Sequence, residues 1–396
     1  MDPARRLAFI PPRSGADVVG GAEASLREVA HRLAGRGWEV DILTTQARDH
    51  VTWANELPAG SEPDGPVTVT RFPVVNDTPG HQRALVEHLL AEGDDPTIDE
   101  QEAWVNDGLR SPALYHHLMD TSDRYRAVIV SPYLFWTTFA CGQIDPARTI
   151  LRPCLHDEPY ARLELFEPLF TGVTGRWLFT EPEHDLLGRL FPTTIGPRSE
   201  VVGDGVTVPD DYDPDGFRRR HGLGDRRFVL YGGRREGGKG WPELVDGFAD
   251  AVRSGIELTL VTFGVGAVEP PPDLADRIID LGRISDTERD DAFAAADAYL
   301  QPSTMESFSR TTMEAWLAGT PVIANAAGAV VRWHCERSGA GLTYADRLEL
   351  TECLRFVAED PTAAAELAAP GRQYVLDHYG WDPTLDRMES TIEAWI

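Results

Sequence analysis

Residues 298–328 contain the pattern that most restricts how this chain can fold. An apolar run at residues 298–301 is followed by Pro302, a polar loop and a short amphipathic segment that stops at Gly319. A second apolar run follows at residues 322–324. A buried strand, a loop, a helix ended by glycine and another buried strand are the repeating parts of a parallel α/β sheet. The stretch therefore predicts a doubly wound α/β domain.

Two acidic residues in this stretch are candidates for ligand binding. Glu306 lies in the loop and Glu314 eight residues later. On one continuous helix, the rise of about 1.5 Å per residue would place them roughly 12 Å apart, comparable to the span from a ribose to a hexose across a diphosphate. The backbone amides of Ser307, Phe308 and Ser309 lie between them, near a predicted helix start that favours an anion. The alternative is an ordinary strand–loop–helix with two solvated acids.

The composition limits the class of protein. A chain of 396 residues can form two or three domains, and 42% hydrophobic and 26% charged residues are typical of globular proteins. The net charge of −27 disfavours nucleic acid and anionic membranes as partners. Four cysteines without C-x-x-C spacing predict reduced thiols and a cytoplasmic protein. The apolar run at residues 7–10 is too short for a signal peptide or a membrane span.

The first half of the chain begins with a β-α-β pattern. Gly20 and Gly21 stand at the first strand–helix turn, without the spacing of a dinucleotide-binding motif. In the region of residues 76–124, two amphipathic helices flank an acidic stretch at residues 92–102, and we expect this region to cover the acceptor side of the domain. The predicted strands are residues 7–10, 40–44, 67–72, 127–130, 149–155 and 176–179, and the predicted helices are 22–34, 82–90, 112–119 and 183–191.

The second half repeats the alternation of strands and helices. A segment rich in Asp and Pro, residues 209–216, reads as an interdomain linker. The domains expected are therefore residues 1–208, residues 217–375 and a final helix at 376–396. The predicted strands are residues 228–231, 258–263, 277–281, 298–301, 322–324 and one near 342, and the predicted helices are 242–252, 287–295, 329–337, 348–357 and 370–396.

A glycine-rich loop follows the strand at residues 228–231. It carries Gly233, Arg234 and Lys239, so two cations stand at the carboxyl end of a strand, where ligands of α/β sheets bind. Residues 233–239 also fit the first seven positions of a nucleotide triphosphatase loop. The eighth position is Gly240, although Ser or Thr is needed there to bind magnesium. A triphosphatase is therefore an unfavoured alternative.

Taken together, these motifs resemble retaining glycosyltransferases of the GT-B fold, family 4. The stretch from 301 to 328 is similar to the E-x7-E signature of that family, and residues 234–240 resemble its Arg-x4-Lys-Gly pattern. The sequence departs from the commoner family form at Ser307 and Ser309, where glycine is usual, and a serine side chain is expected to narrow the approach to the backbone amides. The matching residues of the signature are Pro302, Ser303, Glu306, Phe308, Glu314, Ala315, Gly319, Thr320, Pro321 and Val322.

The resemblance implies a fold of two doubly wound, Rossmann-like domains facing a cleft. The second domain would bind a nucleotide-diphosphate sugar, and the last helix would cross back to the first domain, with Trp381 at the break. The acids would bind the donor, Glu314 at the ribose and Glu306 at the sugar, while the cations and the 307–309 amides hold the diphosphate. The other donor-binding residues implied are Gly20, Gly21, Gly233, Arg283 and Ile284.

The resemblance also gives His156 a place beside the reacting sugar. His156 is therefore a candidate for catalysis and acceptor binding, together with Arg234, Lys239 and Glu306 as catalytic residues. The residues expected around a small soluble acceptor are Asp17, Tyr133, Trp136 and His156. The cations would replace a metal, so neither metal nor cofactor is expected. A phosphorylase or an epimerase on the same two-domain frame is the main alternative, and a non-catalytic sugar-nucleotide binder is a third.

Overall fold

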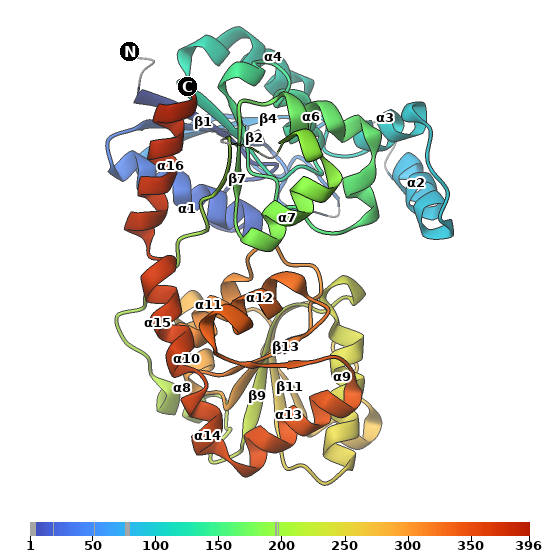
Figure 1. The fold of residues 1–396 in the computed structure, drawn as a ribbon, viewed down its shortest axis with the longest axis vertical. Coiled ribbons are helices and arrows are strands. Elements are labelled where there is room, and N and C mark those ends of the chain that lie inside the picture. Colours follow the sequence, from blue (N-terminus) through green and yellow to red (C-terminus); the bar gives the residue numbers. More distant parts are fainter. Residues whose placement is uncertain (1–4, 19, 51, 76–79, 195, 197) are drawn as a thin grey trace. The chain divides into compact units, whose positions relative to one another are not determined.

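A computed structural model describes residues 5–18, 20–50, 52–75, 80–194, 196 and 198–396 of the chain (Figure 1). Residue 19 of the loop at 11–21, and residues 76–79 at the start of the 76–124 region, lie outside the described residues. The chain divides into two compact units. The first comprises Met1–Asp204 with Asp382–Ile396, and the second comprises Gly205–Trp381.

The first unit is built on a mostly parallel sheet of eight strands in the order β3-β4-β2-β1-β5-β6-β7-β8. Only β3 is antiparallel, at the edge of the sheet. The chain reverses its direction of winding between β1 and β5, which is the switch point of this sheet. The strands are β1 Arg6–Ile10, β2 Glu39–Thr45, β3 Gly60–Asp64, β4 Val67–Phe72, β5 Ala127–Val130, β6 Thr149–Leu151, β7 Gly175–Leu178 and β8 Ser199–Val201.

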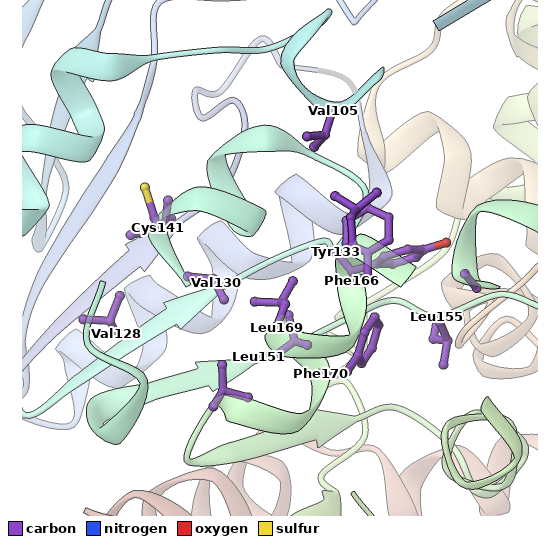
Figure 2. Close-up of a cluster of buried hydrophobic side chains, with 14 of the residues drawn as sticks. Val105, Val128, Val130, Tyr133, Cys141, Leu151, Leu155, Phe166, Leu169 and Phe170 are labelled. Carbon is purple, nitrogen blue, oxygen red and sulfur yellow. The ribbon is translucent and has the colours of Figure 1, made fainter. Parts of the chain in front are cut away.

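Helices cover this sheet through apolar faces that the sequence pattern predicts. In α1, Leu26, Val29, Ala30 and Leu33 are buried, as their spacing of three and four residues requires. Figure 2 shows part of the main core of this unit, where residues of β5 and β6 pack against the segment around α6. The helices are α1 Gly21–Gly35, α2 His81–Glu92, α3 Ile98–Asn106, α4 Pro112–Thr121, α5 Trp136–Cys141, α6 Glu167–Gly172 and α7 Glu181–Leu190.

The C-terminal helix belongs to the first unit, as predicted. Helix α16 spans Trp381–Trp395 and follows a break at Tyr379 and Gly380. Arg36, after α1, forms ion pairs with Asp382, Asp386 and Glu389 of α16, so α1 and α16 lie side by side (Figure 1). A Cβ atom on Gly175 of β7 would lie 2.1 Å from the ring of Trp395, so this helix packs directly on the sheet.

The second unit contains a six-stranded, fully parallel sheet in the order β11-β10-β9-β12-β13-β14. This order places the switch point between β9 and β12, the first and fourth strands of the unit. The strands are β9 Phe228–Arg234, β10 Thr259–Val265, β11 Ile278–Asp280, β12 Ala298–Gln301, β13 Val322–Asn325 and β14 Leu342–Tyr344.

Both faces of this sheet are covered by helices, which explains why its strands are continuous apolar runs. One core cluster joins α9 and α13 to the sheet through residues such as Phe248 and Leu354. Helices α10, α11 and α15 pack together, and α10 also packs on α8. The helices are α8 Pro214–Arg220, α9 Trp241–Arg253, α10 Asp286–Ala295, α11 Arg310–Leu317, α12 Ala329–Ser338, α13 Arg347–Glu359, α14 Pro361–Glu366 and α15 Ala369–His378.

The prediction of two doubly wound α/β domains is confirmed, with local differences. The acidic stretch at 92–102 runs into a helix, α3, which begins with a capping box between Thr97 and Glu100. Helix α8 begins inside the segment expected to be a linker, because Pro214 occupies its first turn and the Asp213 side chain accepts a hydrogen bond from Gly216 N–H. Strand β3 was not predicted, because its residues are polar and mostly exposed.

Candidate functional site

The candidate site of the second unit lies at the carboxyl edge of its sheet. Because β9 and β12 are parallel neighbours, the loops that follow them leave the sheet at the same edge. These loops carry most of the donor-binding residues predicted from the sequence. Open α/β sheets bind ligands at this edge, at the switch point, and β9 and β12 are the two strands on either side of it.

The β9 loop approaches the β12 loop so closely that one position must be glycine. Gly240 has a φ of +69°, and a Cβ atom there would lie 2.6 Å from the backbone oxygen of Pro302. Any side chain at this position would both strain the backbone and clash with the neighbouring loop. Serine or threonine therefore does not fit where a triphosphatase loop requires its magnesium ligand, and this alternative loses its geometric basis.

An ion pair connects the two loops. The Nζ atom of Lys239 lies 2.7 Å from Oε1 of Glu306, and the two side chains are 25% and 17% exposed. The ammonium group also lies 3.4 Å from the backbone oxygen of Met305. Burial and the charge of Glu306 both raise the pKa of nearby Tyr231, whose hydroxyl donates to the backbone oxygen of Arg234. The pair is thus partly buried, and Lys239 also contacts the backbone of the loop that carries Glu306.

The two adjacent arginines of the β9 loop have different environments. Arg234 ends β9, is 43% exposed, and has its Nη1 atom 3.0 Å from Glu236. Arg235 is buried, and its guanidinium donates to Asp280, Thr262 and the backbone oxygen of Gly266. Arg234 is therefore accessible to a ligand, whereas Arg235 holds the loops of β9 and β10 together.

The loop after β12 explains the departure from glycine at Ser309. Ser309 has a φ of +67°, a left-handed conformation in which glycine is favoured. Its hydroxyl lies 3.0 Å from that of Thr312 and accepts from the Gln301 side chain at 2.8 Å. The side chain is thus bonded inside the protein, so it does not narrow the approach to the backbone as the sequence suggested. Ser307 precedes it in the loop and is partly exposed.

The buried side chain of Phe308 anchors the same loop. Its ring is buried and packs edge-on against Tyr379 and against His334, with ring centroids 5.0 and 5.7 Å apart. Burial lowers the pKa of His334 to about 3, so this side chain is neutral. Its Nδ1 atom lies 2.9 Å from the hydroxyl of Tyr374. The loop that carries Glu306 is therefore anchored on an aromatic cluster.

Glu314 lies in α11, as predicted, but Glu306 does not share that helix. Helix α11 begins at Arg310, so the rise of one continuous helix does not describe the separation of the two acids. The Glu314 side chain is 13% exposed, and its Oε2 atom lies 3.6 Å from Nε of Arg289 in α10. Burial raises the pKa of Glu314, and the charges of Arg289 and Arg310 oppose this shift.

Arg283 and Ile284 follow β11 at the same edge of the sheet. Arg283 is exposed and Ile284 is partly exposed. The turn that carries them is hydrogen-bonded to the end of β10, where Gly264 donates its N–H to the backbone oxygen of Gly282. Gly233 lies opposite Gly264, and a Cβ atom on Gly264 would be 2.0 Å from the Gly233 oxygen. The segment with Arg283 and Ile284 thus lies on the β9 side of the switch point, beyond β10.

In the first unit, His156 and Tyr133 are connected through Glu158. The Tyr133 hydroxyl donates to Glu158 Oε1 at 2.8 Å, and His156 Nδ1 lies 3.8 Å from the same oxygen. Tyr133 was predicted to line an acceptor pocket, but its ring is fully buried beside Phe166 and Phe170 (Figure 2). The Tyr133 side chain therefore has no exposed surface to offer a ligand, whereas the His156 side chain is 25% exposed.

The remaining residues of the first unit occupy different environments. Gly20 precedes α1, and a Cβ atom on it would lie 2.2 Å from the carboxylate of Glu23, so a side chain at this position would displace that carboxylate. Gly21 is the first residue of α1, and a Cβ atom on it would have no other atom within 4 Å, so there is space for a side chain at this position. Asp17, in the loop before it, is exposed. Trp136 is partly exposed and donates from Nε1 to Asn106 at 3.0 Å.

Two residues were not singled out from the sequence. Glu158 lies two positions after His156, beyond the end of a predicted strand. A charged residue after the carboxyl end of a strand is the sequence signal that could have identified it. Arg289 lies on a helix whose many charges look solvated in the sequence, and only the packing of α10 on α11 reveals its contact with Glu314. Among the residues that the structure describes, no group of three or more His, Cys, Asp or Glu side chains is arranged to hold a metal ion.

Comparison with known proteins agrees with this geometry. Residues 226–360 match the family described as glycosyl transferases group 1. The matched range lies within the second unit. Both candidate cations and both candidate acids lie inside the matched range. The match supports the prediction of a glycosyltransferase.

Two curated relatives show how far the likeness extends. The chain is 29% identical to 2-deoxystreptamine glucosyltransferase of Streptomyces kanamyceticus over 44% of its length and 50% of the relative. It is 27% identical to D-inositol 3-phosphate glycosyltransferase of Thermobispora bispora over 94% of its length and 90% of that protein. Apart from this second relative, the chain spans about half the length of the curated relatives it matches.

Solved structures show the same fold. Sucrose-phosphate synthase from Thermosynechococcus elongatus aligns with a TM-score of 0.73 and 18% identity over 98% of both chains. Anabaena HepE, solved in complex with UDP and glucose, aligns with a TM-score of 0.68 and 16% identity over 98% of this chain and 99% of that one. The chain therefore has the GT-B fold. None of the described helices is long and apolar enough to cross a membrane.

Proposed function

We propose that this protein is a retaining glycosyltransferase that moves a sugar from a nucleotide-diphosphate sugar to a hydroxyl group of a small soluble acceptor. The observation that carries the proposal is the ion pair between Lys239 and Glu306, which joins the loops on either side of the β9–β12 switch point. A cation and a hydroxyl-binding carboxylate at this position suit the charged and the sugar parts of one donor molecule. The group 1 match over residues 226–360 supports the same assignment.

The proposed chemistry depends on charge stabilisation. Breaking the bond between the sugar and the diphosphate builds negative charge on the leaving group, and fixed cations stabilise that charge in the transition state. Lys239 and Arg234 supply the cations, and the amides of residues 307–309 add hydrogen-bond donors. Glu306 then binds hydroxyls of the transferred sugar, and Glu314 binds those of the ribose. No metal or cofactor is needed for these steps.

Retention is proposed because the sequence motifs resemble those of retaining enzymes. No side chain is placed as an obvious nucleophile among the described residues of the site, so attack on the front face of the sugar is proposed in place of a covalent intermediate. The acceptor would attack from the side that the diphosphate leaves, and the leaving phosphate would take the acceptor proton. His156, held near Glu158, would orient the sugar or the acceptor. The anomeric configuration of the first-formed product, measured by proton NMR, tests this step. A product with the same configuration as the donor is expected, and an inverted product would contradict it.

The acceptor is proposed to be soluble and the enzyme cytoplasmic, because the chain carries a net charge of −27. Basic residues near an anionic bilayer each contribute about 1 kcal/mol to binding, and acidic residues oppose it. Asp17 and Trp136 are exposed or partly exposed residues that could contact such an acceptor. Flotation with phosphatidylserine vesicles at physiological salt should leave the protein at the bottom of the gradient. Tight co-migration would contradict a soluble acceptor.

A two-step experiment tests the function as a whole. UDP-, GDP- and ADP-sugars are first compared by thermal shift, since a ligand that binds only the folded protein stabilises it. The stabilising donor is then incubated with a panel of sugars, cyclitols and aminocyclitols, and release of the nucleoside diphosphate is followed. Transfer to one acceptor class is expected. Dependence on inorganic phosphate instead of an acceptor would identify a phosphorylase, and conversion of the donor without an acceptor would identify an epimerase.

A further inference from the structure

Arg289 connects three acidic side chains at the edge of the candidate donor site. Its guanidinium lies 2.8 Å from Asp286, 3.0 Å from Asp290 and 3.6 Å from Glu314. Asp286 and Asp290 belong to α10, like Arg289 itself, whereas Glu314 belongs to α11. The contact with Glu314 is thus the one that reaches across to another helix. The Arg289 side chain is 27% exposed, so it is held mostly inside the protein.

We propose that Arg289 is a positioning residue for the donor ribose, which keeps Glu314 oriented and able to accept hydrogen bonds from two neighbouring hydroxyls. This inference rests on the proposed function, in which Glu314 binds the ribose. An ionised carboxylate only accepts hydrogen bonds, whereas a protonated one carries a donor of its own. Ribose hydroxyls must donate to a carboxylate that binds them firmly, so the ionised form is the one that the site requires.

Glu314 needs such a partner because of where it lies. Burial favours the neutral form and raises its pKa, and Arg289 is the leading cation that opposes this effect. Arg310, on the same helix as Glu314, acts in the same direction. The other titratable or charged groups facing this region are Asp286 and Asp290 of α10, Tyr299 of β12, Tyr212 of the segment before α8 and Arg372 of α15.

Asp290 and Asp286 hold Arg289 in place for this role. Both Nε and Nη2 of Arg289 donate to the same oxygen of Asp290, and Nη1 donates to Asp286. Asp290 is only 18% exposed, so its bonds fix the guanidinium more firmly than those of Asp286, which is 90% exposed. The Nε atom that donates to Asp290 is also the atom nearest to Glu314. The arginine is therefore fixed on its own helix and presented to the next one.

The test compares ribose recognition in wild-type protein and in two variants. UDP, GDP and ADP are each titrated by calorimetry alongside their 2′-deoxy counterparts, at pH 7.5 and pH 9. Arg289→Met removes the charge but keeps the length of the side chain, and Arg289→Lys keeps one positive charge. Arg253→Met is the matched control, because Arg253 forms a surface ion pair with Asp273 in the same unit.

Wild-type protein should prefer the ribonucleotide by about tenfold or more, as expected for a hydrogen bond to a charged acceptor. Arg289→Met should weaken this preference at pH 7.5, and raising the pH to 9 should restore part of it, because a higher pH favours the ionised form of Glu314. Arg289→Lys and Arg253→Met should keep the preference at both pH values. A role in packing alone would not give a preference that returns with pH.

Two results would overturn the inference. One is an unchanged preference in Arg289→Met at pH 7.5. The other is a wild-type preference for the ribonucleotide that grows steadily from pH 7 to pH 9, which would mean that Arg289 does not keep Glu314 ionised. This second measurement needs only wild-type protein, so it decides the matter even if the Met variant fails to fold. Failure of wild-type protein to bind any of the three diphosphates would instead count against the proposed function.

Discussion

The Nζ atom of Lys239 lies 2.7 Å from Oε1 of Glu306, although the two residues are 67 positions apart in the sequence. The two residues come from loops that follow β9 and β12, the strands on either side of the switch point. A diphosphate entering this site would compete with Glu306 for the ammonium group. The pair therefore holds the cation in position before a ligand arrives, which reduces the reorganisation needed on binding.

Removal of either candidate cation, Lys239 or Arg234, should slow sugar transfer. Lys239→Ala and Arg234→Ala should each lower turnover by about two orders of magnitude or more, the size expected when one charge-stabilising group is lost. Steady-state kinetics with the identified donor measures this. Arg253→Ala is the control, because Arg253 bonds Asp273 on the surface of the same unit. Wild-type turnover in both loop variants would contradict the diphosphate assignment.

The two acids should differ in their effects on binding. Glu314→Ala should weaken binding of the bare nucleoside diphosphate by roughly 1–3 kcal/mol, because hydrogen bonds to a charged acceptor are lost. Glu306→Ala should change this binding little and should reduce turnover of the nucleotide sugar. Calorimetry and kinetics on the same preparations separate the two effects. The opposite pattern would mean that the donor is bound the other way round, with its ribose at Glu306 and its sugar at Glu314.

Chelation should leave sugar transfer largely unchanged. Gly240 has no room for a metal-binding side chain, and Lys239 and Arg234 carry the positive charge that a metal would otherwise supply. Initial rates before and after treatment with EDTA measure this. Complete loss of activity that magnesium or manganese restores would favour a metal-dependent mechanism.

The fold could be predicted from the sequence largely because its strands are short apolar runs followed by glycine-rich or polar loops. Strand β12, for example, has the predicted bounds. The helix that follows it stops before Gly319, as predicted, and Gly319 has a φ of +80°. These features depend on local pattern and backbone conformation. Helix α3 was missed because its acidic composition masked the capping box at Thr97.

Side-chain contacts in the site could be predicted less well. The sequence placed Lys239 and Glu306 in one site but did not show that they pair, and nothing in it indicated that Arg289 contacts Glu314. It also suggested that Ser309 is an obstacle, whereas the Ser309 hydroxyl bonds Gln301 inside the protein. Such contacts depend on how helices and loops pack in three dimensions, which periodicity along the chain does not determine.

His334 should make the second unit sensitive to acid. Its pKa in the folded protein, about 3, lies below the value of about 6.5 in an unfolded chain, so protons bind the unfolded state first. The stability that depends on neutral His334 is present above pH 6.5 and declines as the pH falls toward 3, by at most about 1.4 kcal/mol per pH unit. Phe308 packs on this ring, so acid should also loosen the loop that carries Glu306.

Thermal unfolding at pH values from 7.5 to 4 measures this effect in wild-type protein and in His334→Gln, whose side chain does not titrate. The wild-type midpoint should fall more steeply with decreasing pH than that of the variant. Parallel curves for the two proteins would show that His334 titrates normally in the folded state.

The most direct test of the account is calorimetric titration of UDP, GDP and ADP into wild-type protein and into Lys239→Ala. The account predicts that at least one diphosphate binds the wild-type protein at a single site, and that Lys239→Ala weakens this binding about tenfold or more, since one charged hydrogen bond to phosphate is lost. The corresponding nucleoside monophosphate should lose less affinity in the variant than the diphosphate. Equal affinity of both proteins for every diphosphate, or no binding by the wild-type protein, would contradict the account.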